Sequence, residues 1–583
     1  MLSCNHVQRT KLASRCDWLT DIISLGLFLL IFYTLYLGAY PLFTPDEGRY
    51  SEVAREMITS GDYITPRVNG VIFLDKPILY YWLQATAIHF FGLKEWALRV
   101  FPALSGIWGC LITYICGRRL FDRRTGLIAA IILATAPLYF ANAHYADLDL
   151  EIAVFISSSL LCFITAIQHE RLRAYFLYAG YFFAALAFLT KGLIALAFPG
   201  AILGCWMLLT DRIKLIKQMH LIRGSLLFLA ISLPWYILAQ RANPEFLHYF
   251  FITQQVTRFL SHANFNNQAP FWFYLPIILI GFFPWTSFLL QALWQACQRI
   301  WQAREQAQIE LFLLLWIAII LIFFSIPASK IVGYILPLFP ALALLTARYL
   351  SEAWDFTKPF CLGLFAVFSL IMTVLLLSLP HYQWIAISPH LIPYLYGMSA
   401  IFICSTSTVL ICHTQISLGK LFFLFTATNL IFLLLLVKSA TYLNQASTKP
   451  LALALGNIIK PQDEVATYFN YYQDLPLYLE RQVTIAADWQ AANIATKDNW
   501  QRELWYGMTF QKTNDYLIQE NEFWRRWSSG KRMFVIVSDK YYKQFTQHAS
   551  TYYFLMKTGD VNLLSNTKYP PLTGDKSKNR QYH

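Results

Sequence analysis

Long apolar runs, separated by short polar segments, recur along most of this chain. A helix that crosses about 30 Å of hydrocarbon needs about 20 mostly apolar residues, so each run of that length is a candidate span. Candidate spans start near Cys16, Trp96, Arg124, Ile152, Tyr175, Leu193, Gly224, Phe271, Ile309, Ile331, Phe360, Leu391 and Leu421. The pattern predicts a polytopic all-α membrane domain of about 13 helices over residues 1–442. The first run is long and lacks a small-residue cleavage site, so we expect it to be retained as a span.

The pattern changes near residue 443, where an ordinary polar composition replaces the apolar runs. Strand-like stretches such as "DEVATYF", "QVTIA" and "RMFVIVS" are mixed there with helix-like segments. About 140 residues is an ordinary size for a domain. We therefore predict that residues 443–583 form an α/β domain outside the membrane, on the side opposite the N-terminus.

Composition and charge agree with a membrane protein and indicate its orientation. Hydrophobic residues make up 57% of the 583 positions, charged residues only 14%, and the net charge is +13. The basic residues gather in alternate short loops, which the positive-inside rule assigns to the cytoplasm. These residues are Arg9, Lys11, Arg15, Arg118, Arg119, Arg123, Arg124, Arg171, Arg173, Arg212, Lys214, Lys217, Arg223, Arg299 and Arg304. No basic groove with interleaved aromatic residues accompanies them, so we expect no nucleic-acid partner.

Cysteine placement adds one further expectation about the fold. None of the ten cysteines falls in a segment that this topology places outside. A disulfide framework is therefore not expected.

The first outside loop, residues 41–95, contains two helical patterns. One is an apolar stripe at helical spacing made of Tyr50, Val53, Ala54, Met57 and Ile58, with Gly61 expected to end the helix. The other lies in "PILYYWLQATAIHFFG" and places one set of side chains on a common face, namely Leu79, Trp82, Leu83, Thr86 and Phe90. This second stretch is short for a span. We predict that both helices lie in the membrane interface.

The stretch "FTPDEGRYSEVAREM" at the start of the first helix holds an unusual number of charges. Thr44 at the N-cap, Pro45 at the first helical position and Glu47 at the third would form a capping box, which is a structural explanation for Glu47. Asp46 is not part of this box, and both a functional role and that of an ordinary helix-start aspartate stay open for it. At a helix N-terminus its carboxylate is electrostatically favoured.

Other ionisable residues are predicted at the same membrane surface. They are Asp75, Lys76, Asp147, Asp149, Lys191, His248, Arg258 and Lys330. Such groups are costly at a membrane unless they pair or bind a ligand. Cations opposite carboxylates suit an anionic phosphate beside a group that acts as a base. Structural alternatives stay open: Lys191 and Lys330 as snorkelling helix ends, Arg258 as an ion-pair partner, and one of the two aspartates as a helix cap.

The motifs together resemble a known family. "PDEGRYSEVAREM", "GDYITP", "DKPILYYW", "LTKGLIALAFP", "FLHYFF" and "APFWFYLP" occur in this order. They resemble the bacterial lipid A aminoarabinose transferases, which are GT-C class glycosyltransferases related to protein O-mannosyltransferases. The resemblance covers roughly the first 350 residues. It implies about thirteen spans in the inner membrane and an active site that faces the periplasm.

The resemblance also assigns roles to individual residues. It implies that Asp46 and Asp149 are catalytic. It implies a set that binds the donor and its phosphate, namely Arg49, Lys76, Lys191, Arg258 and Lys330, and a set that lines the cavity, namely Glu47, Tyr50, Tyr81 and Tyr334. Asp75 stands where the family usually has glutamate and is the candidate ligand of a divalent metal. Gln254 and Gln255 stand where relatives often have histidine, so no cofactor is certain.

The expected function is an inverting transfer of sugar from a polyprenyl phosphate to an envelope acceptor. The resemblance implies 4-amino-4-deoxy-L-arabinose carried on undecaprenyl phosphate, lipid A of lipopolysaccharide as acceptor, and polymyxin resistance as the outcome. Two alternatives stay open: a transferase that acts on a protein or on another glycan, and a transporter or flippase. Transporters usually place polar groups near the membrane midplane, whereas here they are predicted at one surface.

Overall fold

The computed structural model describes residues 2–257, 267–382, 388–413, 415–444, 447–494, 499–513 and 515–569. The chain forms two compact units, each built from three segments. The first unit comprises Met1–Ala39, Arg99–Tyr236 and Asn267–Tyr442. The second comprises Tyr40–Leu98, Ile237–Asn266 and Leu443–His583, and so includes two segments that precede residue 443. The domain boundary between residues 442 and 443 stays a prediction.

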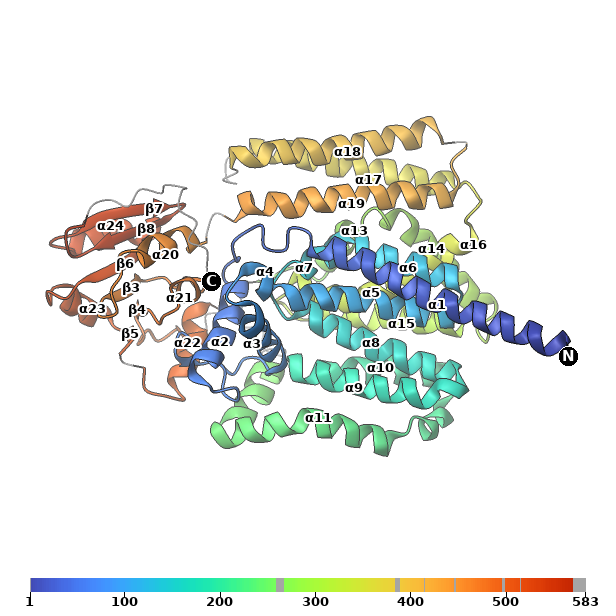
Figure 1. Ribbon diagram of the computed structural model, residues 1–583, viewed down its shortest axis with the longest axis horizontal. Helices are drawn as coiled ribbons and strands as arrows, with labels where there is room; N and C mark the ends of the chain where they lie inside the picture. The colour runs from blue at the N-terminus through green and yellow to red at the C-terminus, as the bar shows by residue number, and fades with distance from the viewer. Residues whose placement is uncertain are drawn as a thin grey trace. The chain divides into compact units, whose positions relative to one another are not determined.

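The first unit is built of helices, which run side by side in Figure 1. In chain order its α-helices are α1 (Leu2–Thr34), α5 (Val100–Leu120), α6 (Arg123–Thr135), α7 (Pro137–Ala143), α8 (Asp149–Gln168), α9 (Arg173–Lys191), α10 (Ile194–Leu209), α11 (Leu221–Ala242), α13 (Tyr274–Gly281), α14 (Thr286–Gln302), α15 (Gln308–Ser325), α16 (Phe339–Glu352), α17 (Pro359–Ser378), α18 (Ile392–Ile411) and α19 (Leu418–Leu443). A 3₁₀ segment, η4 (Val332–Leu338), precedes α16. The described cysteines all carry free thiols.

The helices confirm a polytopic membrane fold, with fewer full-length spans than predicted. Among the described residues, ten helices are long and apolar enough to cross a membrane, or up to twelve if two bent pairs each count as one span. The pairs are α6 with α7, bent by 66°, and α13 with α14, bent by 114°. The remaining predicted span corresponds to α10, whose 16 residues extend roughly 24 Å. Hydropathy alone does not show where an apolar run bends, or where its helix is too short to cross the membrane.

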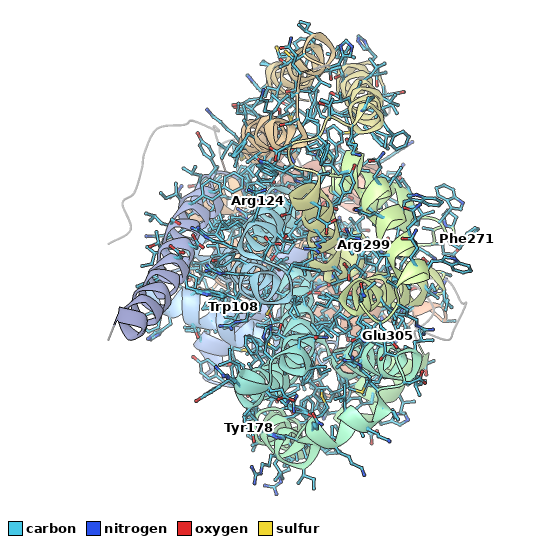
Figure 2. The ribbon with its side chains drawn as sticks, turned by 90° about the vertical axis from the view of Figure 1, so that its right-hand side faces the viewer. Trp108, Arg124, Tyr178, Phe271, Arg299 and Glu305 are labelled. Carbon is cyan, nitrogen blue, oxygen red and sulfur yellow. The ribbon has the colours of Figure 1, made fainter. Side chains whose placement is uncertain are left out.

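The first unit has a central helix and an apolar outer surface. The most apolar window of α8 is 89% buried, whereas those of α1 and α17 are 28% buried. Figure 2 looks along the helices and shows side chains filling the spaces between them. Trp108, labelled there, donates a hydrogen bond from its indole nitrogen to Ser158 Oγ on α8 at 3.2 Å. Large apolar side chains such as Ile222 and Phe423 are exposed on outer helices, as expected of a surface that meets lipid.

The second unit contains a six-stranded mixed sheet. Its strands are β3 (Glu464–Tyr468), β4 (Thr484–Ala486), β5 (Leu517–Ile518), β6 (Met533–Ser538), β7 (Tyr553–Thr558) and β8 (Val561–Ser565). The order is β5-β4-β3-β6-β8-β7, with β5, β4, β3 and β6 parallel and β8 antiparallel to both β6 and β7. The three stretches predicted as strands form β3, β4 and β6. The α/β character of the C-terminal region is thereby confirmed.

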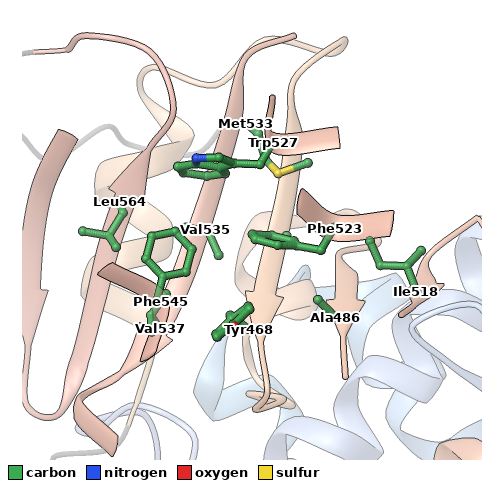
Figure 3. Packing of buried hydrophobic residues seen from close by; sticks show 11 residues of the cluster. Tyr468, Ala486, Ile518, Phe523, Trp527, Met533, Val535, Val537, Phe545 and Leu564 are labelled. Carbon is green, nitrogen blue, oxygen red and sulfur yellow. The ribbon is translucent and has the colours of Figure 1, made fainter. Parts of the chain in front are cut away.

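In the part of the chain that the structure describes, five helices accompany this sheet. They are α20 (Lys449–Gly456), α21 (Leu475–Leu479), α22 (Trp500–Met508), α23 (Glu520–Trp527) and α24 (Asp539–His548). Two of them, α23 and α24, complete its core. Figure 3 shows Phe523 and Trp527 of α23 and Phe545 of α24 packed with strand residues such as Val535. This burial of aromatic and β-branched side chains supplies the main stabilisation of the sheet.

The segment 40–98 also belongs to the second unit. It forms α2 (Asp46–Ser60), a hairpin of β1 (Arg67–Val68) and β2 (Val71–Ile72), α3 (Leu79–Phe91) and α4 (Glu95–Leu98). Gly61 ends α2 as predicted, in the left-handed conformation (φ 72°) that glycine adopts without strain. The predicted stripe of α2 is buried at Tyr50, Val53, Ala54 and Met57, but so are Glu52, Arg55 and Glu56. Nearly the whole of α2 is therefore enclosed, not one face only.

The α3 helix packs within the unit through a face other than the predicted apolar one. Its buried residues include Tyr80, Tyr81 and Gln84, whereas Thr86 and Phe90 are exposed and Trp82 is half-buried. The polar groups of the buried face bond within the unit, since Gln84 Nε2 donates to the Tyr80 hydroxyl at 3.1 Å. The apolar face is the outer one, which suits a helix that meets lipid.

Candidate functional site

The start of α2 differs in detail from the predicted capping box. The helix begins at Asp46, so Pro45 is the N-cap and Asp46 is the first helical residue, not the second. Pro45 makes no side-chain cap, and Glu47 Oε2 accepts a hydrogen bond from the backbone nitrogen of Phe43 at 2.8 Å. Glu47 still ties the preceding turn to the helix, one residue further back than expected. It is fully buried.

Asp46 and Arg49 form an ion pair one helical turn apart on α2. An Asp46 carboxylate oxygen contacts Arg49 Nη2, and Arg49 Nη1 lies 2.6 Å from both carboxylate oxygens of Glu503 on α22. The Asp46 side chain is 40% exposed, whereas that of Arg49 is 11% exposed. Arg49 therefore holds in place a carboxylate that solvent, and so a substrate, can reach. Charge-assisted bonds of this kind are the strong ones.

Aromatic rings complete the surroundings of the guanidinium group. The Arg49 guanidinium carbon lies 5.0 Å from the ring centre of Tyr50 and 5.8 Å from that of Phe73. Arg49 Nε is buried and has no hydrogen-bond partner in the described part of the chain. Contact with ring faces stabilises a desolvated cation. Arg49 is thus fixed by two carboxylates and two rings.

Asp75 lies in the same unit and has its own polar partners. Its Oδ1 accepts hydrogen bonds from the Tyr249 hydroxyl and, at 3.1 Å, from Gln254 Nε2. The Tyr249 ring in turn packs against Tyr506 and Phe510. No group of three or more His, Cys, Asp and Glu side chains arranged to hold a metal occurs among the described residues. A hydroxyl and an amide donate to Asp75, and donors of that kind do not suit a metal ligand set.

Tyr81 lies close to the same charged groups. Its side chain is fully buried, and its hydroxyl has no hydrogen-bond partner among the described residues. Burial raises the pKa of the Tyr81 hydroxyl, an effect that the Arg49 cation opposes and the Asp75 and Glu503 carboxylates reinforce. Burial likewise raises the pKa of Glu503; Arg49 lowers it, and Asp75 and Asp46 add to the rise. We call Asp46, Arg49, Asp75, Tyr81 and Glu503 the α2 cluster.

A second pair lies in the first unit, where α8 and α9 meet. Lys191 Nζ at the end of α9 forms an ion pair with Asp149 Oδ1 at the start of α8. The same ammonium lies 4.1 Å from the ring centre of Tyr334 on η4. The side chains of Asp149 and Lys191 are 10% and 12% exposed. Asp147 Oδ1 accepts from the Asp149 backbone nitrogen at 2.9 Å and so turns the chain into α8.

Backbone packing holds Asp149 against η4. An added Cβ at Gly333 would lie 2.6 Å from Asp149 Oδ2, so only glycine allows this approach. We call Asp149, Lys191 and Tyr334 the α8 cluster.

The remaining predicted residues have other environments. Lys330 is buried, and its ammonium donates to the carbonyl oxygens of Pro327 and, at 3.1 Å, Ala269. Burial lowers the pKa of Lys330. Lys76 is half-buried between Asp75 and Pro77. Arg258 lies outside the residues that the structure describes.

Sequence reasoning missed Glu503 and Tyr249. Glu503 lies 454 positions from Arg49, in a region without a recognised motif. The available signal was local: Asn499 caps α22 by accepting from the Arg502 backbone nitrogen at 3.1 Å, and Glu503 follows in the first turn. Tyr249 lies within the quoted "FLHYFF" motif, and its partner Gln254 is one of the two departures from the family pattern.

Comparisons with known proteins show which family model, proteins and solved structures this chain is similar to. The family model for dolichyl-phosphate-mannose-protein mannosyltransferases matches residues 75–238. An undecaprenyl phosphate-alpha-4-amino-4-deoxy-L-arabinose arabinosyl transferase from Erwinia tasmaniensis is 30% identical over 539 residues, which are 87% of this chain and 90% of that protein. A protein of the same name from Aeromonas salmonicida is 34% identical over 341 residues, 58% of this chain and 60% of that protein. The crystal structure of ArnT from Cupriavidus metallidurans bound to undecaprenyl phosphate shares 25% identity, with a TM-score of 0.80 over 94% of this chain and 98% of that chain.

Proposed function

This chain belongs to the family of undecaprenyl phosphate-alpha-4-amino-4-deoxy-L-arabinose arabinosyl transferases, and we propose that it transfers this amino sugar to lipid A at the periplasmic face of the inner membrane. It is a multi-pass membrane glycosyltransferase whose donor is a polyprenyl-phosphate-linked sugar. The family relationship supports a transferase over a transporter or flippase. The periplasmic orientation is supported by the basic loops that the positive-inside rule assigns to the cytoplasm.

The observation that carries the proposed chemistry is the Asp46–Arg49–Glu503 arrangement. A transferase of this type must bring an acceptor oxygen to the anomeric carbon while the phosphate leaves from the opposite side. Asp46 is the reachable carboxylate of the α2 cluster, and Arg49 and Glu503 fix its position. We assign Asp46 the contact with the acceptor oxygen. It removes a proton if the acceptor is a hydroxyl, and it orients the acceptor if the acceptor is an ionised lipid A phosphate.

The donor phosphate requires cations, because negative charge grows on it as the glycosidic bond breaks. Groups that bind this charge more strongly in the transition state than in the ground state speed the reaction. We assign this role to Lys76 and, by family resemblance, to Arg258, and we assign binding of the donor to Lys191. Arg49 is engaged by two carboxylates, so we assign it the positioning of Asp46. Asp149 holds the ammonium of Lys191 in place.

A divalent metal at Asp75 is not part of this proposal. The partners of Asp75 are a hydroxyl and an amide that donate to it, so the side chains around it do not form a metal ligand set. Every assigned step uses side chains of the chain itself.

The test is a mass spectrum of lipid A. The protein is expressed in a Gram-negative host that lacks its own aminoarabinose transferase but makes the donor. We expect lipid A to gain one aminopentose with the wild-type chain and none with Asp46→Asn, at equal amounts of protein in the membrane. The added amine would lower the negative charge of lipid A and so reduce polymyxin binding. Unmodified lipid A with the wild-type chain would contradict lipid A as the acceptor and would favour a protein or another glycan in that role.

A further inference from the structure

The Tyr81 hydroxyl is the least explained polar group of the α2 cluster. It is fully buried and has no hydrogen-bond partner within the described ranges of the chain. A buried hydroxyl without a partner costs free energy, so such a group is expected to meet a ligand. The ring centre of Tyr81 lies 6.0 Å from that of Tyr50, which is itself 5.0 Å from the guanidinium carbon of Arg49, the partner of Glu503. Asp75 accepts from Tyr249, whose ring packs at 5.4 Å against Tyr506, three residues after Glu503 on α22. Any ligand group that reaches Tyr81 therefore meets two carboxylates and one guanidinium.

The electrostatic balance around Glu503 favours a cation. The ion-pair partner of Glu503 is Arg49, at 2.6 Å, and the same guanidinium contacts Asp46. Asp46 and Glu503 thus share one guanidinium, and the two partners of Asp75, Tyr249 and Gln254, are neutral. An unbalanced group of carboxylates in partly desolvated surroundings attracts a positively charged ligand.

We propose that Glu503 and Asp75, with the Tyr81 hydroxyl, bind the ammonium group of the donor sugar and thereby select an amino sugar over a neutral sugar of similar shape. This inference rests on the proposed function, which supplies the amine. An ammonium group donates up to three hydrogen bonds, and two carboxylates and a phenol oxygen are three acceptors. A site built around a polar substrate group rejects the analogue that lacks it far more strongly than an apolar pocket would.

Asp46 and Glu503 then have separate tasks on the two sides of Arg49. Asp46 contacts the acceptor oxygen, whereas Glu503 contacts the sugar amine and anchors the guanidinium. The first determines the rate of transfer for any sugar, and the second determines which sugar is used. Glu503 and Tyr81 are therefore specificity-determining residues of the same reaction.

The experiment compares two donors on the purified full-length protein. One donor carries the free amino sugar, and the other carries the same sugar with the amine formylated and so neutral. We measure kcat/KM for both with wild type, Glu503→Gln and Tyr81→Phe. The matched control is Glu522→Gln, since Glu522 is an ion-paired glutamate on α23 whose partners Arg525 and Arg526 lie on the same helix.

We expect the wild-type preference for the amino donor to fall about tenfold or more in Glu503→Gln, because a charge-assisted hydrogen bond is lost. Tyr81→Phe should reduce the preference in the same direction without changing the thermal unfolding midpoint, since its hydroxyl bonds to no described group. Glu522→Gln should keep the wild-type preference. The quantity compared is the ratio of kcat/KM for the two donors. A general loss of activity lowers both values and leaves this ratio unchanged.

Three results would overturn the inference. Equal use of both donors by the wild type would remove amine recognition while leaving the proposed transfer intact. An equal loss for both donors in Glu503→Gln and Tyr81→Phe would show a structural role only. Loss of activity on both donors after treatment with EDTA would indicate a divalent cation at these carboxylates instead. Failure of the wild type to transfer either sugar to lipid A would contradict the proposed function itself.

Discussion

The α2 cluster and the α8 cluster both pair an aspartate with a cation, yet they differ in access and in balance. Asp46 is 40% exposed, whereas Asp149 is 10% exposed. Arg49 is shared by two carboxylates, whereas Lys191 pairs with Asp149 and an aromatic ring. An accessible carboxylate can contact a substrate, and an enclosed one is suited to holding its partner. We therefore propose chemistry at the α2 cluster and donor binding at the α8 cluster.

The largest expected effect is that of Asp46→Asn on transfer. Loss of the reachable carboxylate should lower kcat/KM by about 100-fold or more, the usual contribution of a general base or an oriented carboxylate. Folding should be unaffected, because the Asp46 side chain is 40% exposed and Arg49 keeps Glu503 as its partner. Steady-state transfer and thermal unfolding of the purified protein check both points. An Asn variant with full activity would remove Asp46 from the mechanism.

Substitutions in the Asp149–Lys191 pair should lower the stability of the protein as well as its activity. Asp149→Asn or Lys191→Met alone leaves one charge without its partner, at a cost of roughly 3 kcal/mol in the free energy of unfolding. The double variant removes both charges and should recover much of that loss. Unfolding of the wild type, the two single variants and the double variant in detergent forms the thermodynamic cycle. Additive losses in the double variant would show that the two charges do not depend on each other.

Gly333→Ala perturbs the same pair without changing a charge. The new Cβ would lie 2.6 Å from Asp149 Oδ2 and 3.0 Å from Asp149 Cβ, so the carboxylate must move. We expect a loss of about 2 kcal/mol, typical of overpacking, together with weaker binding of undecaprenyl phosphate. Gly200→Ala is the control, because an added Cβ there meets no atom within 4 Å. Equal behaviour of the two variants would contradict the close approach of η4 to Asp149.

Glu56 is a residue of α2 that affects the stability of the fold and has no assigned part in the transfer reaction. It is buried, accepts from the Gly70 backbone nitrogen at 2.7 Å, and has its pKa raised to about 8 by burial and by Glu52. The folded state therefore holds this proton at pH values where the unfolded chain has lost it, and stability falls as pH rises between about 5 and 8. Between pH 6 and 7 the loss is about 1 kcal/mol.

Glu56→Gln should remove that part of the pH dependence while leaving transfer in place. Thermal unfolding midpoints measured from pH 5 to 8 compare it with the wild type. A variant with the same pH profile as the wild type would show that Glu56 is already ionised in the folded protein.

Sequence alone predicts local partners better than distant ones. Asp46 and Arg49 lie three residues apart on one helix, a spacing at which side chains meet, and the quoted motif contains both. Glu503 contacts them from 454 positions away, and no periodicity in the chain connects the two segments. The location of Asp46 near a basic residue was therefore within reach of the sequence, whereas the excess of carboxylates around Arg49 was not.

The α3 helix shows why an apolar stripe is a weaker guide in a membrane protein. In water-soluble proteins the apolar face turns inward, but a helix beside lipid can expose it. Phe90 is 72% exposed, while Tyr81 and Gln84 are fully buried. Hydropathy therefore identifies the helix and the number of apolar runs more reliably than it identifies which side faces the protein.

The most direct test of the division between the clusters measures binding and chemistry separately in Asp46→Asn and Lys191→Met. Affinity for undecaprenyl phosphate is measured first, and a single turnover of saturating donor is then followed by rapid quench. We predict that Asp46→Asn binds like the wild type and turns over about 100-fold more slowly or worse. Lys191→Met should bind more weakly and, once saturated, turn over within about tenfold of the wild type. The reverse pattern, weak binding in Asp46→Asn and normal binding with lost turnover in Lys191→Met, would contradict this account.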